Sequence, residues 1–361
     1  MRGPLRTPRL RRSDCSAPGL RRVRRGRGFG YLDAGGERVD DEETLARIRE
    51  LGIPPAWEEV WICPDPRGHL QATGIDAAGR KQYLYHAVWR ELRDRQKFQT
   101  MEDFAEALPG LRRQVDADLR STEDLSRGRV LACAVRMIDV GQFRIGGEEY
   151  AKEEGGLGLA TLGRQHVRIS GGAAVFDYPA KSGVQRVLEL RDPDCVAVLT
   201  VLRRRRGGPD ELLAYREGRR WKPVRSDDIN EYVKEHLGAQ FSAKDFRTWN
   251  ATVLAAVELA KRVPEEGRRR SSKRVFSAVA REVAAVLGNT PAVARRSYID
   301  PRVFDRYPQV ALRRTIDDIS RLDETPDARR RAIERGVLDL LREDRESSAV
   351  EVRPELESQA A

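Results

Sequence analysis

The chain has 361 residues, a formal net charge of +10 at pH 7 and a pI near 9.6. This length exceeds that of one typical domain and predicts two packed units with tails. The charge indicates a polyanionic partner such as nucleic acid. A membrane span is excluded, because no run of roughly twenty apolar residues is present.

The positive charge is concentrated in residues 1–28, which contain ten arginines and one acid, Asp14. This segment carries +9 of the net charge and leaves +1 for the rest of the chain. It is rich in Arg, Pro and Gly and poor in apolar residues, so it is predicted to be a disordered Arg-rich tail. It lacks the uninterrupted apolar region of a secretory signal.

Residues 29–97 are expected to form a small N-terminal domain. The pattern from Phe29 to Leu84 is typical of strands separated by turns, with one helix from Glu42 to Leu51. The charged stretch from His86 to Lys97 predicts a connector helix at the end of this domain.

Residues 98–343 are expected to form a larger domain, followed by a flexible tail over residues 344–361. Apolar residues recur at helical spacing in these stretches: Phe104–Val115, Val130–Val140, Ile229–Leu237, Thr248–Val263, Val275–Leu287 and Arg313–Ile319. A period of two indicates three antiparallel strands: His166–Ser170, Ala174–Tyr178 and Val184–Leu190. The predicted fold class is therefore α+β, with a small β-containing N-terminal domain and a larger, mainly α domain that carries an antiparallel three-stranded β element.

The four cysteines are scattered and have no companion histidines at zinc-ligand spacing. They are expected to be unpaired thiols in a reducing cytoplasm. The patterns of a phosphate-binding loop, a zinc-protease helix and a calcium loop are all missing from the sequence. The sequence therefore predicts chemistry that uses no cofactor and no metal.

Tyr298 is the candidate nucleophile. Breaking a phosphodiester without a metal needs a nucleophile, an acid for the leaving oxygen and fixed positive charge for the non-bridging oxygens. The free pKa of tyrosine is about 10, so neighbouring cations must stabilise an attacking phenolate. Arg295 and Arg296 precede Tyr298, shortly after the helix stop signals Gly288 and Pro291. Taken alone, this segment also fits an ordinary tyrosine packed at a helix end.

Four other segments join the one around Tyr298. In chain order the five are Gly79–Tyr85 (GRKQYLY), Phe143–Leu162 (FRIG, then GLATL), Tyr178–Gly183 (YPAKSG), Phe241–Thr248 (FSAKDFRT) and Gly288–Tyr298 (GNTPAVARRSY). Together they resemble type IB DNA topoisomerases of the bacterial and poxvirus kind, over a range from about Gly30 to about Arg306. The resemblance implies the fold shared by tyrosine recombinases and type IB topoisomerases, and an enzyme that relaxes supercoiled DNA.

The resemblance also implies a role for each catalytic residue. Tyr298 attacks the phosphorus and forms a 3′-phosphotyrosyl intermediate, and religation needs neither ATP nor metal. Arg144 and Arg247 clamp the scissile phosphate, which suits a planar and permanently charged guanidinium. Lys181, at the tip of a predicted hairpin, protonates the leaving 5′ oxygen. Considered singly, Arg144 and Arg247 fit surface ion-pair partners better than phosphate ligands, and Lys181 fits a solvated turn lysine better than a general acid.

Asn289 departs from part of the family pattern, because the poxvirus members and many others have a histidine there. An amide can hydrogen-bond a non-bridging oxygen but cannot become a cation. Since the family role is transition-state hydrogen bonding, retained activity is expected.

The resemblance implies a set of DNA-binding residues as well: Gln82, Tyr83, Tyr85, Tyr150 and Lys244. Tyr83 and Tyr85 are two positions apart on a predicted strand, so they share one face of it. A buried core pair of tyrosines is an equally good interpretation of that spacing.

Two alternative functions stay open from the sequence. Tyrosine site-specific recombinases share the chemistry, but they usually carry His-x-x-Arg at the second arginine, where this chain has Lys244-Asp245-Phe246-Arg247. A non-enzymatic basic DNA-binding protein would rely on the arginine tail and not on Tyr298. The preferred interpretation is a monomeric, nucleoid-associated cytoplasmic enzyme whose partner is duplex DNA.

Overall fold

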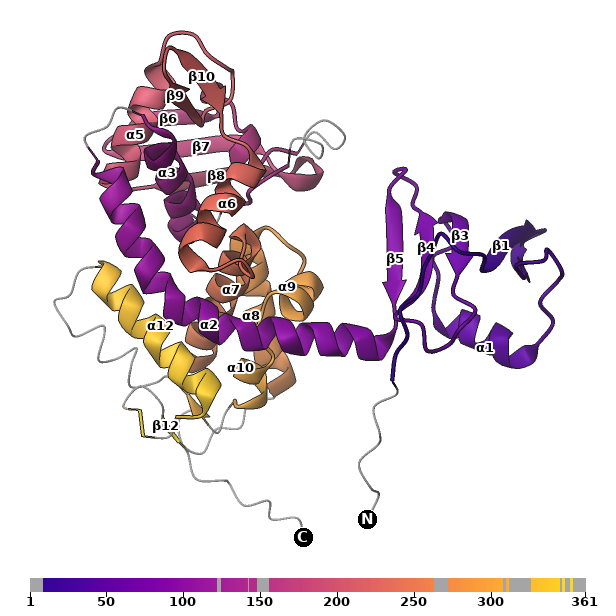
Figure 1. Cartoon of the computed structure of the whole chain (residues 1–361). Coiled ribbons are helices and arrows are strands. Elements are labelled where there is room, and N and C mark those ends of the chain that lie inside the picture. The colour runs from indigo at the N-terminus through magenta and orange to yellow at the C-terminus, as the bar shows by residue number, and fades with distance from the viewer. Residues whose placement is uncertain are drawn as a thin grey trace. The chain divides into compact units, whose positions relative to one another are not determined.

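The structure, a computed structural model, describes residues 9–121, 125–141, 143–147, 156–262, 272–307, 310–311, 326–344, 346–347 and 351–352. The chain divides into two compact units, Met1–Phe98 and Gln99–Ala361, close to the boundary expected between residues 97 and 98 (Figure 1).

Unit 1 is built on an antiparallel sheet with the strand order β2-β1-β3-β4-β5. Its elements are β1 (Leu20–Arg25), β2 (Gly28–Leu32), α1 (Glu42–Glu50), β3 (Glu58–Ile62), β4 (Leu70–Ile75) and β5 (Lys81–Tyr85). Helix α1, which confirms the helix predicted here, begins after Asp41, whose carboxylate accepts a hydrogen bond from Thr44 N–H at 2.8 Å. The buried core combines α1 with the sheet: Leu20, Ile48, Val60, Ile62 and Ala72.

The prediction of a disordered tail over residues 1–28 is wrong for the part that the structure describes, residues 9–28. Leu20–Arg25 forms β1 and pairs with both β2 and β3. The low apolar content is misleading because the fold supplies partners for polar groups in this strand, as Arg22 shows. Arg22 lies 4.2 Å from the ring centroid of Phe29, and its guanidinium donates to three carbonyls, those of Ile53, Pro54 and Trp57.

Helix α2 (Ala87–Leu119) begins in unit 1 and continues into unit 2 with Pro109 inside it. The expected connector helix and the first helix of the larger domain are therefore one element. Along α2, apolar side chains at helical spacing are buried: Phe98, Met101, Phe104, Leu108, Leu111, Val115 and Leu119. This continuous stripe explains why the helix is not interrupted between the two predicted segments.

Unit 2 is mainly helical, and the predicted α+β fold class is confirmed. Its other helices are α3 (Arg127–Gly141), α5 (Pro193–Arg204), α6 (Ser226–Leu237), α7 (Ala243–Ala260), α8 (Ser272–Leu287), α9 (Pro291–Ser297), α10 (Arg302–Asp305) and α12 (Pro326–Arg342). Its strands are β6 (Val167–Ser170), β7 (Ala173–Pro179), β8 (Gln185–Leu190), β9 (Ala214–Glu217), β10 (Arg220–Pro223), β11 (Val310–Ala311) and β12 (Glu351–Val352). Short 3₁₀ turns are η1 (Leu159–Thr161), η2 (Arg164–His166) and η3 (Lys181–Gly183).

The antiparallel sheet β6-β7-β8 confirms the three strands predicted from the period of two. Strand β8 lies at one edge of this sheet. Phe143, which follows α3, packs edge-on against Phe176 of β7 at a centroid distance of 4.8 Å and stacks with Tyr178. All three rings are buried. This aromatic contact fixes the start of the segment that carries Arg144.

The flexible tail expected over residues 344–361 is wrong at Glu351–Val352. These residues form β12 and pair antiparallel with β11, so this part of the expected tail takes part in a backbone ladder. The helix expected over Arg313–Ile319 lies outside the described residues. Helix α5, the hairpin of β9 and β10, and helix α12 have no counterpart among the predicted elements.

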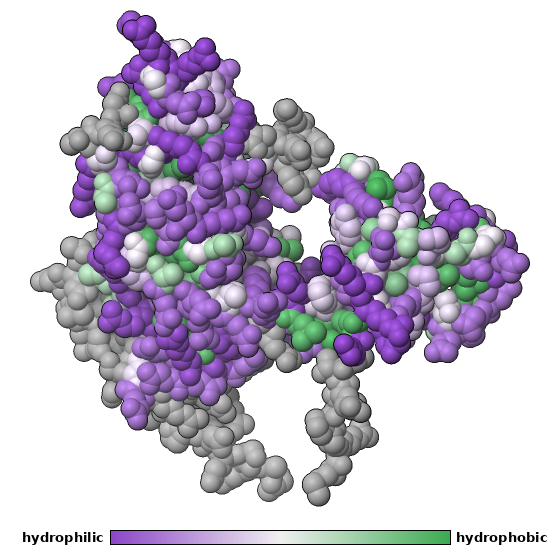
Figure 2. Space-filling view, in the orientation of Figure 1, coloured by the Kyte–Doolittle hydropathy of each residue, from purple (hydrophilic) through white to green (hydrophobic). Residues whose placement is uncertain are grey.

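Figure 2 shows hydrophilic side chains over most of the visible face of each unit. In the described part of the chain, none of the helices combines the length and the apolarity that crossing a bilayer requires. The four cysteines, Cys15, Cys63, Cys133 and Cys195, are not disulfide-bonded.

Candidate active site

Tyr298 lies directly after the short helix α9, where the sequence GNTP sets the geometry. Helix α8 ends at Leu287, and Gly288 adopts a left-handed conformation with φ of +62°. Thr290 caps α9 by accepting a hydrogen bond from Val293 N–H, and Pro291 supplies its first residue. The chain therefore turns between two helices and presents Tyr298 half-buried beside α7.

Arg247 is buried on α7, with 6% of its surface exposed. Its Nη2 donates to Leu287 O at 3.0 Å, and its guanidinium carbon lies 5.2 Å from the ring centroid of Tyr298. Within the described residues, Nη1 of Arg247 is buried without a hydrogen-bond acceptor. The structure thus places the second predicted arginine against the predicted nucleophile.

Arg144 reaches the same place from the loop after α3. Its Nη2 donates to Gly288 O at 2.7 Å and to Asn289 Oδ1 at 2.5 Å. The loop is held by backbone bonds from the η1 segment, since Leu159 N–H donates to Arg144 O at 2.8 Å. Gly158 and Gly146 touch at this point, and a Cβ on Gly158 would lie 2.3 Å from the Cα of Gly146.

Asn289 offers a donor next to these two arginines. Its Oδ1 accepts from Arg144, whereas its Nδ2 is buried and has no hydrogen-bond partner in the part of the chain that the structure describes. Buried donors are almost always hydrogen-bonded, so an orphaned one marks a place where a ligand oxygen fits. Nη1 of Arg247 is a second buried donor that requires an acceptor.

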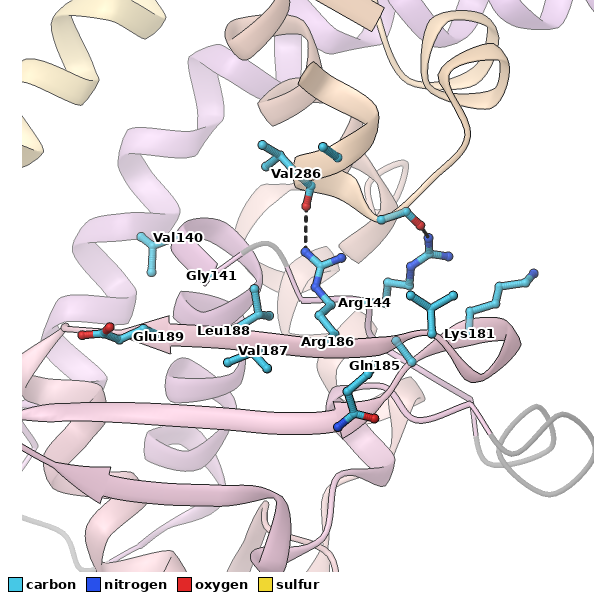
Figure 3. A pocket seen from close by; sticks show the side chains of 14 residues that line it. Val140, Gly141, Arg144, Lys181, Gln185, Arg186, Val187, Leu188, Glu189 and Val286 are labelled. Atoms are coloured by element: carbon cyan, nitrogen blue, oxygen red, sulfur yellow. Dashed lines mark hydrogen bonds between the residues drawn. The ribbon is translucent and has the colours of Figure 1, made fainter. Parts of the chain in front are cut away.

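Lys181 is exposed on η3, the turn between β7 and β8. The turn is closed by backbone bonds between Ala180 and Val184 at 2.8 Å and between Gly183 and Ala180 at 3.0 Å. Lys181 and Arg144 line one pocket of about 500 Å³ between β8 and the end of α8. Figure 3 shows both side chains in this lining. Arg144 therefore contacts Asn289, and Arg247 lies against the ring of Tyr298. The two arginines bind adjacent carbonyls, and Lys181 lines the same pocket as Arg144.

Positive charge dominates the site. Burial, reinforced by the charge of Arg144, lowers the pKa of Arg247 to about 10, and the phenol of Tyr298 partly offsets this effect. Burial and Arg144 also lower the pKa of Arg186, a third arginine that the sequence analysis missed. Burial raises the pKa of Tyr178, against the opposing charges of Arg186, Arg144 and Arg247. Cations that destabilise one another in this way favour a bound anion.

Arg186 could have been found from the period of two in β8. Gln185, Val187 and Glu189 are exposed, whereas Leu188 is half-buried and Leu190 is buried. This alternation places Arg186 on the inward face of β8 together with the two leucines. An arginine on the buried face of a strand is unusual and points to a specific partner.

In unit 1, the predicted DNA-binding residues lie on edge strand β5. Tyr83 and Tyr85 are 46% and 36% exposed, and their rings stack at a centroid distance of 6.3 Å. They are therefore not the buried core pair that their spacing also allowed. Gln82 is half-buried and donates to Asp76 Oδ2 at 2.9 Å. His69 extends the aromatic row beside Tyr85.

The two remaining predicted DNA contacts have different outcomes. Lys244 is exposed in the first turn of α7, three residues before Arg247. Tyr150 lies outside the described residues. Within those residues, no three His, Cys, Asp and Glu side chains gather in a group that could hold a metal ion.

Comparison with known proteins identifies the family. Residues 86–320 match the family described as eukaryotic DNA topoisomerase I, catalytic core, and residues 28–76 match the bacterial DNA topoisomerase IB N-terminal domain. DNA topoisomerase 1B of Acanthamoeba polyphaga mimivirus is 29% identical over 298 residues, which cover 80% of this chain and 87% of that protein. DNA topoisomerase 1B of Vaccinia virus (strain Copenhagen) is 20% identical over 272 residues, 74% of this chain and 82% of that protein. DNA topoisomerase 1 of Schizosaccharomyces pombe is 26% identical over 185 residues, 50% of this chain and 22% of that protein. The chain belongs to the type IB DNA topoisomerase family, and it is an isomerase that acts on DNA.

Proposed function

We propose that this enzyme relaxes supercoiled duplex DNA by cutting and resealing one strand through a 3′-phosphotyrosyl bond to Tyr298, without ATP or metal. The observation that carries the proposal is a pair of buried donors that have no acceptor in the described residues. They are Nη1 of Arg247, whose guanidinium lies against the Tyr298 ring, and Nδ2 of Asn289, whose Oδ1 accepts from Arg144. The non-bridging oxygens of a phosphodiester are acceptors of the required charge. We infer that these donors form the anion site that serves Tyr298 as the nucleophile.

In the proposed cleavage step, the phenolic oxygen of Tyr298 forms a bond to phosphorus while the bond from phosphorus to the 5′ oxygen breaks. The phenolic proton passes to water, and Lys181 gives a proton to the leaving 5′ oxygen. Arg144, Arg247 and Asn289 hydrogen-bond the non-bridging oxygens, on which charge builds in the transition state. Religation is the reverse of this step.

The proposed mechanism stores the energy of the cut phosphodiester in the phosphotyrosyl bond, so resealing requires no nucleotide. While the adduct exists, the strand with the free 5′ hydroxyl rotates about the intact strand and releases supercoils. Stacking of the Arg247 guanidinium on the Tyr298 ring supports this role, because a cation there stabilises the phenolate. Since every group in this scheme comes from one chain, we further propose that a monomer suffices.

Incubation with negatively supercoiled plasmid in EDTA, without ATP, tests the proposal. We expect relaxation in single linking-number steps and a covalent protein–DNA adduct after addition of denaturant, both lost in Tyr298→Phe. Tyr307→Phe is a matched control, because Tyr307 is a buried tyrosine whose hydroxyl donates to Arg262 O at 2.9 Å, away from the site. Unchanged plasmid topology with the wild-type protein would contradict the proposal. Strand exchange between paired sites would indicate a recombinase instead.

A further inference from the structure

Three successive backbone carbonyls at the end of α8 each accept a hydrogen bond from a different arginine. The pairs are Arg186 Nη2 with Val286 O at 2.8 Å, Arg247 Nη2 with Leu287 O at 3.0 Å and Arg144 Nη2 with Gly288 O at 2.7 Å. The last carbonyls of a helix lack partners within the helix and form the negative end of its dipole. The end of α8 therefore gathers three guanidinium groups, and two of them belong to the proposed phosphate clamp.

Arg186, the third of these residues, comes from the hairpin that carries Lys181. It lies opposite Tyr178 in the register of β7 and β8, five positions after Lys181. Because β8 is an edge strand, only β7 supports it within the sheet. Figure 3 shows Arg186 rising from β8 to the carbonyl of Val286, on the side of the hairpin where Arg144 also lies.

The turn after α8 is shaped to admit this side chain. A Cβ on Gly288 would lie 2.5 Å from Nη1 of Arg186, closer than real Cβ contacts, and the φ of Gly288 is +62°. Glycine at this position therefore makes room for Arg186 as well as ending the helix. The same glycine precedes Asn289, so Arg186 contacts the segment that leads to the nucleophile.

Placing a guanidinium in the surroundings of Arg186 costs free energy, which an arginine that only fills space would not offset. Its Nε is buried without a hydrogen-bond partner in the described part of the chain. Arg144 and Arg247 are its charged neighbours, and Tyr178 is the group that favours its charged form. A methionine would fill similar space without burying a third cation. This cost indicates that the guanidinium serves the reaction.

We propose that Arg186 is a positioning residue that ties the Lys181 hairpin to the end of α8, and so holds the general acid in register with Asn289 and Tyr298. This inference rests on the proposed function. The end of α8 is also held by Arg144, by Arg247 and by its own backbone bonds, such as Asn289 N–H to Ala284 O at 3.0 Å. Of the two segments that Arg186 joins, the hairpin has fewer other contacts to hold it than the end of α8. Loss of Arg186 therefore displaces Lys181 more than it displaces the end of α8.

The test measures single-turnover cleavage of a short duplex by Arg186→Met under saturating enzyme. We expect cleavage to slow by about 10- to 100-fold, because a positioned general acid contributes roughly 10² to 10⁴-fold and misplacement loses part of this. Arg191→Met is the matched control, since Arg191 follows β8 and is exposed. Its cleavage rate should equal that of the wild type.

A substrate with sulfur in place of the bridging 5′ oxygen separates positioning of the acid from binding of the phosphate. A thiolate leaves without protonation, because thiols have a pKa near 8.5 and the alkoxide is far more basic. On this substrate, the cleavage rates of Arg186→Met and Lys181→Ala should lie within about threefold of the wild-type rate. The cleavage rate of Arg247→Ala should stay as far below the wild-type rate as on the ordinary substrate. Arg186→Lys keeps the positive charge, so its cleavage rate should fall less than that of Arg186→Met, and the sulfur substrate should again remove most of the loss. If Arg186→Met fails to fold, Arg186→Lys is used in its place.

Two results would overturn the inference. One is a wild-type cleavage rate in both Arg186 variants, and the other is a deficit that sulfur leaves unchanged. If the wild-type protein forms no adduct on either substrate, the proposed function itself fails, and this outcome is distinct from the first two.

Discussion

Two clusters of buried or partly buried arginines in unit 2 differ in the groups that they face. In one cluster, which joins α2, α3 and α12, Arg112 bonds Asp139 at 2.8 Å and Glu334 at 2.6 Å, and Arg330 bonds Asp139 at 2.5 Å. In the other, at the end of α8, the partners are carbonyl oxygens, and the arginines are Arg144, Arg186 and Arg247.

The pKa shifts of the two clusters have opposite signs. Although burial alone would lower it, the neighbouring Asp139 and Glu334 raise the pKa of Arg112. Burial and Arg144 instead lower the pKa of Arg247 to about 10. In the carboxylate-paired cluster, the arginine charges are balanced by carboxylates of the protein itself, and the cluster stabilises the fold. The cluster at α8 retains uncompensated charge and so favours an anion from outside.

The same substitution in each cluster should therefore have different consequences. We expect Arg112→Met to lower the free energy of unfolding by about 3 to 5 kcal/mol, because it leaves Asp139 buried with fewer cationic partners. Urea denaturation measures this change. Arg120→Met is the control, since its ion pair with Asp194 is exposed and should contribute less than about 1 kcal/mol. Equal effects of the two substitutions would contradict the assigned role of the paired cluster.

Arg247→Met should act on the reaction and not on stability. We expect single-turnover cleavage to fall by about 10² to 10³-fold, as for loss of one preorganised donor at a developing oxyanion. The free energy of unfolding should stay the same or rise, because the substitution removes a buried cation that faces Arg144. A loss of stability as large as that of Arg112→Met would show that the two clusters do not differ as described.

Acid should weaken the paired cluster selectively. Arg330 and Arg112 hold the pKa of Asp139 below its usual value, although burial opposes them. The carboxylate therefore stabilises the fold fully above about pH 4, and this contribution is lost as the pH falls towards the lowered pKa. We expect the difference in melting temperature between the wild type and Asp139→Asn to narrow below about pH 4. A difference that stays constant down to pH 2 would contradict this linkage.

Asn289→His should have the smallest effect. Histidine retains a donor for a non-bridging oxygen and can carry a charge, so cleavage should be kept or improved. Single-turnover rates on the same duplex measure this. Complete loss of cleavage with an intact fold would remove Asn289 from the proposed site.

Much of the fold follows from local sequence patterns. The period of two predicts β6, β7 and β8, and helical spacing predicts α6, α7 and α8. Strand β1 is not predictable in this way, because Arg22 within it is satisfied by carbonyls that lie 31 to 35 positions further along the chain. The composition of a segment gives its number of apolar residues, but it does not show which of its polar side chains form hydrogen bonds with distant parts of the chain.

The candidate site shows the same division. Tyr298, Arg144, Lys181, Arg247 and Asn289 follow from motifs that resemble a family. Arg186 carries no motif, and the period of two in β8 predicts only its inward face. Its role depends on a register with Tyr178 and on a turn at Gly288 that lies 102 positions further along the chain. The exposure of Tyr83 and Tyr85 was equally undecidable, since a spacing of two fixes a shared face but not which face is covered.

Mapping the covalent adduct tests the central claim most directly. A duplex is incubated with the wild-type protein in EDTA, trapped with denaturant and digested, and the peptide bound to DNA is sequenced by mass spectrometry. We expect a single linkage, between the phenolic oxygen of Tyr298 and a 3′ phosphate. A linkage to another residue, a 5′ linkage, or no adduct would contradict it.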